Sequence, residues 1–135
     1  MPDKIFVNFP VKSLPTSIEF FRGLGFDFDP QFTDDNATCM IVSDNIYVML
    51  LTDSYFKTFT PKQLCNTRDQ IETLVALSCA SREEVDHLVE RGIALGGREP
   101  RAAMDHGFMF QRTLEDLDGH TWELFYMDPE HLQKQ

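Results

Sequence analysis

Few side chains in this sequence could do chemistry, and they are widely spaced. The four histidines are His87, His106, His120 and His131. The surrounding residues place them, in that order, in a predicted helix, a loop, a hairpin turn and a polar tail. None is therefore expected within a strand, where its side chain could line a site on a sheet. The three cysteines are Cys39, Cys65 and Cys79. They show no C-x-x-C spacing, and no base or orienting partner is visible that would make one of them a nucleophile.

Glu123 is the main candidate for acid–base chemistry, because it is a carboxylate within a mostly apolar predicted strand. It could act as a general base or anchor a ligand, or it could pair with a nearby arginine or reach solvent. Arg112 could bind an anion or pair with Glu123, and both roles fit the sequence. Asn8 and Tyr47, also in predicted strands, could donate hydrogen bonds to a ligand or serve strand packing.

The elements that would position these residues begin with a strand and a helix. Residues 5–11 read I-F-V-N-F-P-V, and their period of two predicts a strand. Ser13 then stands at a helix N-cap position, and Pro15 falls in the first helical turn, where its missing N–H costs little. Further short strands are predicted over residues 26–28, 38–42 and 46–52, with hairpin-turn residues at 43–45.

The second half of the chain shows the same order of elements. Residues 74–79 indicate a buried strand, and the run Ser81-Arg82-Glu83-Glu84 has the spacing of a helix capping box. The apolar stripe of the following helix consists of Val85, Leu88, Val89 and Ile93. Strands are then predicted near 101–104 and over 108–114 and 121–126, with Asp118-Gly119 as the turn before the last one.

Two offsets make this internal repeat explicit. A shift of 68 residues places Phe6 on Leu74 and the cap Ser13 on the cap Ser81, and a shift of 74 residues places Met49 on Glu123. We therefore predict an α+β chain of two βαβββ modules. The first module is expected to cover residues 1–53, a connection 54–71, the second module 72–128 and a polar tail 129–135.

Composition excludes several classes of protein. Of the 135 residues, 42% are hydrophobic, which is too much for a disordered chain. Lys and Arg number 12 against 22 Asp and Glu, and the net charge of -10 argues against nucleic acid or an anionic membrane as the main partner. An odd number of cysteines and the lack of a signal-peptide pattern favour a cytoplasmic protein with reduced thiols. The longest apolar run, residues 46–51, is far shorter than the ~20 residues of a membrane span.

Several stretches resemble the vicinal oxygen chelate superfamily, which includes glyoxalase I, bleomycin-resistance proteins, fosfomycin-resistance enzymes and extradiol dioxygenases. The stretches similar to its opening strand and helix are residues 6–11 (F-V-N-F-P-V), 17–21 (S-I-E-F-F) and 24–26 (L-G-F). Residues 117–123 (L-D-G-H-T-W-E) look like its closing hairpin, with Leu117 in place of the usual proline. The stretches that resemble a branch usually labelled "predicted lactoylglutathione lyase" are residues 39–44, 48–51 and 81–86.

The resemblance implies a cupped mixed sheet with helices on its convex side, and the strand residues Cys39 and Cys79 are expected to face the helices. The ligand-binding residues predicted on this basis are Phe6, Asn8, Tyr47, Met49, Leu74, Arg112 and Glu123. The positions that hold a divalent metal in metal-dependent relatives correspond to Phe6, Met49, Leu74 and Glu123. Only Glu123 suits such an ion, because Phe and Leu have no donor atom and a Met thioether suits soft Cu(I). A catalytic zinc site typically has three protein ligands, so no cofactor is predicted.

Three functional hypotheses accompany the resemblance. The favoured one is a glyoxalase/bleomycin-resistance-like protein that binds a small organic molecule, neutral or cationic, in the cup without a divalent metal. The second is a metal-dependent enzyme, similar to lactoylglutathione lyase or an extradiol dioxygenase, that uses Glu123 with unrecognised ligands. The third is a vestigial site in a protein whose role is association. A homodimer is expected in all three, because relatives commonly pair modules across a two-fold axis.

Overall fold

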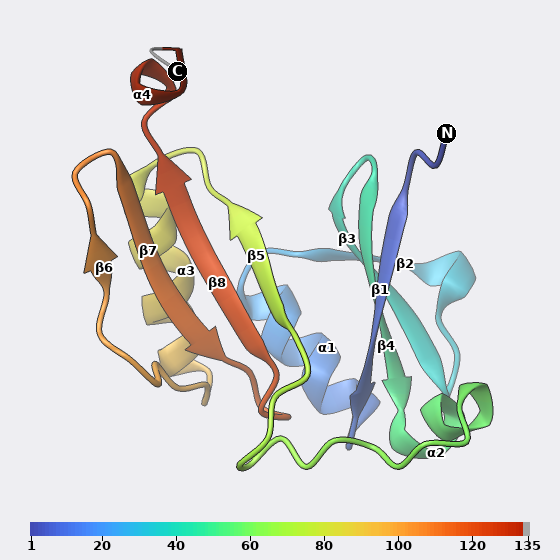
Figure 1. The fold of residues 1–135 in the computed structure, drawn as a ribbon. Helices are drawn as coiled ribbons and strands as arrows, with labels where there is room; N and C mark the ends of the chain where they lie inside the picture. The colour runs from blue at the N-terminus through green and yellow to red at the C-terminus, as the bar shows by residue number, and fades with distance from the viewer. Residues whose placement is uncertain (134–135) are drawn as a thin grey trace. The chain divides into compact units, whose positions relative to one another are not determined.

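Each half of the chain folds into the predicted order of one strand, one helix and three strands (Figure 1). The computed structural model describes residues 1–133, and the chain divides into two units, Met1–Asn66 and Thr67–Gln135. The first unit contains β1 (Ile5–Val11), α1 (Leu14–Gly23), β2 (Asp27–Asp29), the 3-10 turn η1 (Pro30–Phe32), β3 (Ala37–Ser43), β4 (Ile46–Thr52), α2 (Asp53–Phe56) and the 3-10 turn η2 (Lys57–Phe59). The second contains β5 (Leu74–Ser78), α3 (Arg82–Ala94), β6 (Met104–Asp105), β7 (Met109–Glu115), β8 (Thr121–Met127) and α4 (Pro129–Gln133).

Two residues of the predicted polar tail, Lys134 and Gln135, lie outside the described residues. The described part of that tail forms α4. Within residues 1–133, every helix is too short or too polar to cross a membrane.

The two sheets share one topology and an equivalent register. Their strand orders are β1-β4-β3-β2 and β5-β8-β7-β6. β1 runs parallel to β4 and β5 runs parallel to β8, whereas the other neighbouring strands are antiparallel. Asn8 lies beside Met49 in the first sheet, and Ala76 lies beside Glu123 in the second. These pairs are related by the offsets of 68 and 74 residues, so the predicted repeat is confirmed.

Both main helices begin at the predicted caps. The Ser13 hydroxyl accepts a hydrogen bond from the Thr16 amide at 3.4 Å, and the Ser81 hydroxyl accepts one from the Glu84 amide at 3.1 Å. The Glu84 carboxylate in turn accepts a hydrogen bond from the Ala80 amide at 3.2 Å, one residue before the N-cap. Local side chains thus bind amide groups that would otherwise lack partners at the helix starts.

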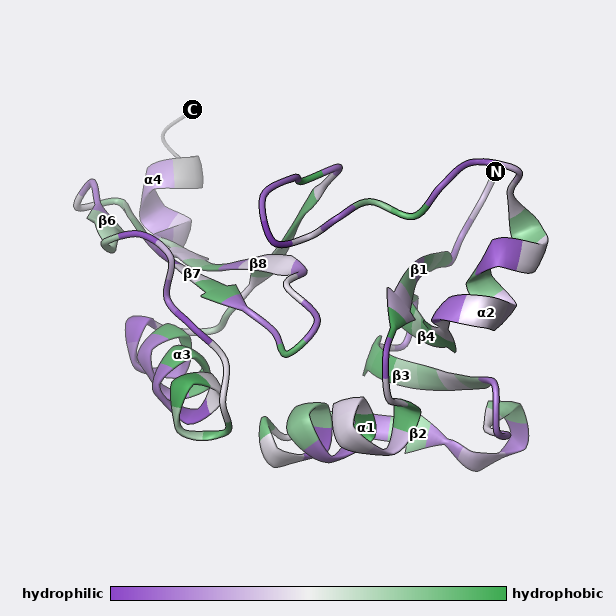
Figure 2. Cartoon of the chain, turned by 90° about the horizontal axis from the view of Figure 1, so that it is seen from below, coloured by the Kyte–Doolittle hydropathy of each residue, from purple (hydrophilic) through white to green (hydrophobic). Residues whose placement is uncertain are grey.

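Each sheet packs one face against its own helix (Figure 2). The buried apolar side chains of the first unit include Phe20 and Phe21 of α1, Met40 of β3, and Val48 and Leu50 of β4. Those of the second unit include Val85 and Val89 of α3, Leu114 of β7, and Trp122 and Leu124 of β8. Burial alternates along β5 and over residues 121–124 of β8, as the sequence predicts. In β3, by contrast, the four residues 37–40 are all buried.

The predicted apolar stripe of α3 needs one correction. Ile93 is 38% exposed, whereas Gly92 is buried. A Cβ atom at position 92 would lie 2.5 Å from Leu114 Cδ2, which is closer than packed carbon atoms approach. The missing side chain of Gly92 therefore lets β7 approach the helix, and α3 packs through Val85, Val89 and Gly92.

A buried carboxylate holds the hairpin between β7 and β8 in shape. Asp116 is only 7% exposed, and one of its oxygens accepts hydrogen bonds from the amides of Asp118 at 2.9 Å and His120 at 3.0 Å. Its other oxygen accepts a hydrogen bond from the Trp122 indole at 2.9 Å. Burial raises the pKa of Asp116 despite these donors. The motif L-D-G-H-T-W-E therefore has a structural role in closing this turn.

We expect Asp116→Ala to lower the free energy of unfolding by about 3 kcal/mol, because three donors would lose a buried, charged acceptor. Urea unfolding measures the change. Asp35→Ala removes an exposed aspartate and should stay within about 0.5 kcal/mol of the wild type. Equal stability of the two variants would show that the hairpin does not need this carboxylate.

Candidate functional site

The first sheet has a face that α1 does not cover, and four predicted ligand-binding residues lie on it. These residues are Phe6 and Asn8 of β1 and Tyr47 and Met49 of β4, and we call this surface the first distal face. They alternate with residues such as Val48, which is buried on the opposite face. Phe6 and Tyr47 are neighbours in the parallel pair, as are Asn8 and Met49.

The aromatic side chains of this face are stacked. The ring centroids of Phe6 and Tyr47 lie 4.8 Å apart with an interplanar angle of 13°. The Lys4 ammonium lies 5.6 Å from the Tyr47 ring centroid. The Tyr47 hydroxyl donates its proton to the Asp44 carbonyl at 2.7 Å, and the Asn8 amide donates to the Phe6 carbonyl at 3.1 Å. The Tyr47 ring thus already contacts Phe6 and Lys4, and its hydroxyl oxygen can only accept a hydrogen bond from a ligand, rather than donate one as the sequence suggested.

The second sheet presents an equivalent surface, opposite α3, which we call the second distal face. Its residues include Leu74 and Ala76 of β5, Gln111 and Thr113 of β7, and Glu123 and Phe125 of β8. Leu74 is 55% exposed and Glu123 is partly buried. The Gln111 side-chain amide donates a short hydrogen bond to the Glu123 carboxylate. The partner of this carboxylate is therefore a neutral amide and not an arginine.

Gln111 is a site residue that the sequence interpretation missed. Thr113 lies opposite Glu123 across the hairpin, and Gln111 lies two residues before Thr113 on the same face. The turn predicted at Asp118-Gly119 already sets this register. Counting back from that turn would have placed Gln111 diagonally across from Glu123, within reach of a long side chain.

Arg112 does not pair with Glu123, so that alternative is wrong. It lies opposite Leu124, on the face covered by α3, and its side chain is 11% exposed. Its guanidinium donates to Asp86 at 2.8 Å, to Glu90 at 2.7 Å, and twice to Glu99 at 2.8 and 2.9 Å. Neighbouring residues of a strand point to opposite faces, so Gln111, not Arg112, shares a face with Glu123.

Comparison with solved structures identifies the fold. A hypothetical protein from S. aureus is 24% identical, with a TM-score of 0.79 over 93% of this chain and 95% of that one. A glyoxalase/bleomycin resistance protein/dioxygenase family enzyme from Burkholderia phytofirmans PsJN is 16% identical, with a TM-score of 0.74 over 90% and 96% of the two chains. This is the vicinal oxygen chelate fold. The fosfomycin resistance protein FosX from Mesorhizobium loti shares it at 13% identity, with a TM-score of 0.69 over 98% of both chains. No protein-family profile matches the sequence, and no curated protein matches it.

The positions that the resemblance assigns to metal ligands in the vicinal oxygen chelate fold do not suit a divalent ion here. Phe6, Met49 and Leu74 offer no oxygen or nitrogen, and Glu123 is already bonded by Gln111. Within residues 1–133, no three or more His, Cys, Asp and Glu side chains gather as a metal site. The residues at these positions therefore do not fit the metal.

None of the four histidines lies on a distal face. His87 is exposed on α3, and His120 is buried in the hairpin before β8. His106 and His131 both stack on Phe108, with ring centroids 6.2 and 4.1 Å from its own. The prediction that no histidine occupies an inward strand position is confirmed.

Cys39 faces the opposite way from the prediction. It pairs with Met49 across β3 and β4, which places it on the first distal face instead of under α1. The register shifts between Ile41 and Ser43, where β3 has an irregularity of the kind a bulge makes. Cys39 precedes this irregularity, so a count back from the turn at 44–45 that ignores the extra residue assigns Cys39 to the wrong face.

The cysteine thiols near the two sheets are poor nucleophiles. Burial and the nearby Asp29 raise the pKa of Cys39. Burial and the Glu84 carboxylate raise the pKa of Cys79 to about 12. Since the thiolate is the reactive form, neither residue is prepared for nucleophilic catalysis near neutral pH.

Arg112→Gln should lower the free energy of unfolding by about 2–3 kcal/mol at pH 7, because three carboxylates would lose their common partner. Arg112 lowers the pKa of Glu99 in the folded state from its ordinary value of 4.5. The Glu99–Arg112 pair therefore stabilises the fold fully above pH 4.5, and this stabilisation is lost as the pH falls through the lowered pKa. Urea unfolding should show a smaller difference from the wild type at pH 3.5 than at pH 7. Arg98→Gln, at a 74% exposed side chain, is the control and should change stability little. A stability difference for Arg112→Gln that does not change with pH would show that ionised carboxylates are not its source.

We expect iodoacetamide at pH 8 to modify the exposed Cys65 well before Cys79, because only roughly one Cys79 thiol in ten thousand would be ionised. Mass spectrometry of the digested protein measures both rates. Glu84→Gln removes the nearby negative charge and should accelerate modification of Cys79 without changing that of Cys65. Equal rates at the two cysteines in the wild type would contradict the raised pKa.

Proposed function

We propose that this protein binds a small organic molecule, cationic or neutral, on its second distal face and without a divalent metal. The observation that carries the proposal is the Glu123 carboxylate, which lies on a strand surface beside Leu74 and Phe125 and has Gln111 as its partner. A carboxylate with a neutral partner keeps its charge available for a ligand. Apolar neighbours strengthen an electrostatic contact because they exclude water.

The hydrogen-bonding groups favour a ligand with N–H donors. Gln111 bonds one oxygen of Glu123, and the other carboxylate oxygen has no hydrogen-bond partner among the described residues. The amide oxygen of Gln111 is a second acceptor. An amine or amidine could donate to both oxygens, and the net charge of -10 would attract such a cation over longer distances.

The first distal face offers an aromatic surface of its own. The stacked Phe6 and Tyr47 rings offer flat apolar surface, and the Lys4 ammonium already lies over Tyr47. Ring faces attract cations, and here the Lys4 ammonium already fills that role and would repel a second cation. The Phe6 surface therefore suits a neutral, apolar group. The fold supports small-molecule binding as a class, because solved proteins that share it include a fosfomycin resistance protein.

We expect that, in a thermal-shift panel of small organic amines, amidines and neutral analogues, at least one cationic compound raises Tm in a concentration-dependent way. Glu123→Gln should weaken its binding at least about tenfold, because a charged hydrogen bond becomes neutral. Glu83→Gln makes the same change of charge on α3 and should leave binding unaltered. The absence of any shift, together with a dimer in sedimentation, would favour the association role instead.

Titration calorimetry with Zn, Ni, Mn and Fe(II) addresses the enzyme alternative. We expect no stoichiometric binding, because three of the four ligand positions are Phe, Met and Leu. A stoichiometric metal that is lost on Glu123→Ala would overturn the proposal. It would instead support a lactoylglutathione-lyase-like or dioxygenase-like enzyme.

A further inference from the structure

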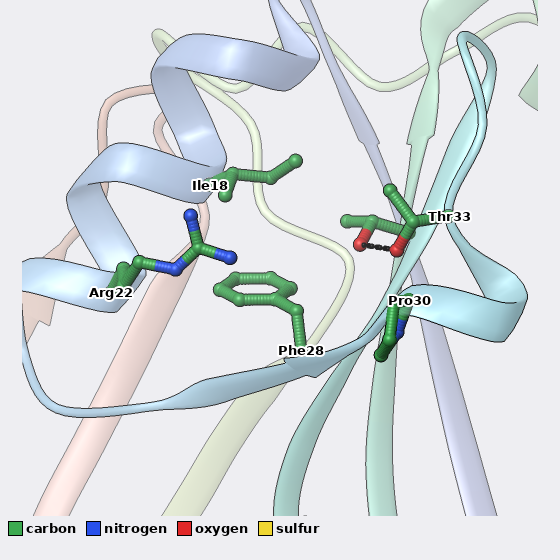
Figure 3. A pocket seen from close by; sticks show the side chains of 6 residues that line it. Ile18, Arg22, Phe28, Pro30 and Thr33 are labelled. Atoms are coloured by element: carbon green, nitrogen blue, oxygen red, sulfur yellow. Dashed lines mark hydrogen bonds between the residues drawn. The ribbon is translucent and has the colours of Figure 1, made fainter.

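The first unit contains a pocket on the side of its sheet that α1 covers, away from the first distal face (Figure 3). Its volume is about 310 Å³. The residues that line it are Ile18 and Arg22 of α1, Phe28 of β2, Pro30 of η1, Thr33, and Thr38 of β3. All of them belong to the unit Met1–Asn66, so the pocket is complete within one unit.

Arg22 has a different environment from the paired arginines of this acidic chain. Its guanidinium lies over the Phe28 ring, 5.5 Å from the centroid, and Arg22 has no ion pair among the described residues. Other arginines behave differently, since Arg82, Arg98 and Arg112 each pair with at least one carboxylate. The guanidinium at the pocket therefore keeps its full set of donors for an anion.

The remaining walls favour an apolar body. Ile18, Phe28 and Pro30 present hydrocarbon surface to the pocket (Figure 3). The Thr33 hydroxyl donates its proton to the Asp29 carbonyl at 2.8 Å, so the 2.8 Å contact between the two hydroxyls uses the proton of Thr38. Both threonine protons are thus used within the protein, and Arg22 supplies the side-chain donors that face the pocket.

We propose that this pocket binds a small organic carboxylate, whose carboxylate pairs with Arg22 and whose apolar body lies between Ile18, Phe28 and Pro30. Planar guanidinium and carboxylate groups match in a two-point hydrogen-bonded pair. A volume of about 310 Å³ corresponds to about ten water-sized groups at roughly 30 Å³ each. Phenylacetate has this size and combines a carboxylate with an aromatic ring. The proposal is independent of the function assigned to the distal faces.

The test is a titration of the ¹⁵N-labelled chain with phenylacetate, followed by amide chemical shifts. Saturable shifts should centre on residues 18–38, with a dissociation constant on the order of millimolar for a ligand this small. Phenylacetamide, which has the same shape without the charge, should bind at least about tenfold more weakly. Arg22→Gln should weaken phenylacetate binding by a similar factor.

The control variant is Arg91→Gln, because Arg91 lies in the last turn of α3 as Arg22 lies in the last turn of α1. It makes the same change of charge and of helix-end electrostatics, and it should bind phenylacetate as the wild type does. Equal binding of phenylacetate and phenylacetamide would overturn the proposal, as would unchanged binding by Arg22→Gln. Shifts centred on Glu123 or Tyr47 would also overturn it and would assign the anion to a distal face.

Discussion

Both distal faces depend on the parallel pairing of β1 with β4 in the first unit and of β5 with β8 in the second. It places Phe6 beside Tyr47 in the first sheet and Ala76 beside Glu123 in the second. Residues in register share a face, and a strand has only two faces. A shift of β8 by one residue would turn Glu123 toward α3 and bring Trp122 out of the core. The same pairing therefore builds the hydrophobic core and selects the side chains of the candidate site.

The ion pairs of Arg112 lie on the opposite side of the sheet from Glu123. Arg112 gathers Asp86, Glu90 and Glu99 on the side of β7 that faces α3. Its guanidinium holds the pKa of Glu99 below the usual range. Glu123, on the other side of the sheet, is left with the neutral Gln111. The alternation of strand residues thus separates a structural charge cluster from a carboxylate that can meet a ligand.

Local features of the fold could be predicted from the sequence because their causes are local. Ser13 and Ser81 cap the helices as expected, since a cap needs only a hydroxyl three residues before an amide. The Asp118-Gly119 turn forms where expected, with Gly119 at a φ of 81° that favours glycine. The alternation of residues along β1, β4 and β8 then predicted that Asn8, Met49 and Glu123 lie on the sheet faces opposite the buried Val48 and Trp122. The prediction failed at Cys39, because a register shift in β3 is a property of two strands and not of one.

The sequence by itself therefore determined the two modules, their helix starts and turns, and the placement of Glu123 on a strand. These features follow from the spacing of residues along the chain, because caps and turns form by short-range hydrogen bonds and strand faces follow the alternation of apolar residues. Only the tertiary structure decided what each polar side chain meets. Gln111 reaches Glu123 across a hairpin, and Arg112 pairs with three carboxylates from α3 and the segment after it. Arg22 lies beside Phe28 and has no ion pair within residues 1–133. Partner choice depends on distances between strands and helices far apart in sequence, and these distances exist only once the units have folded.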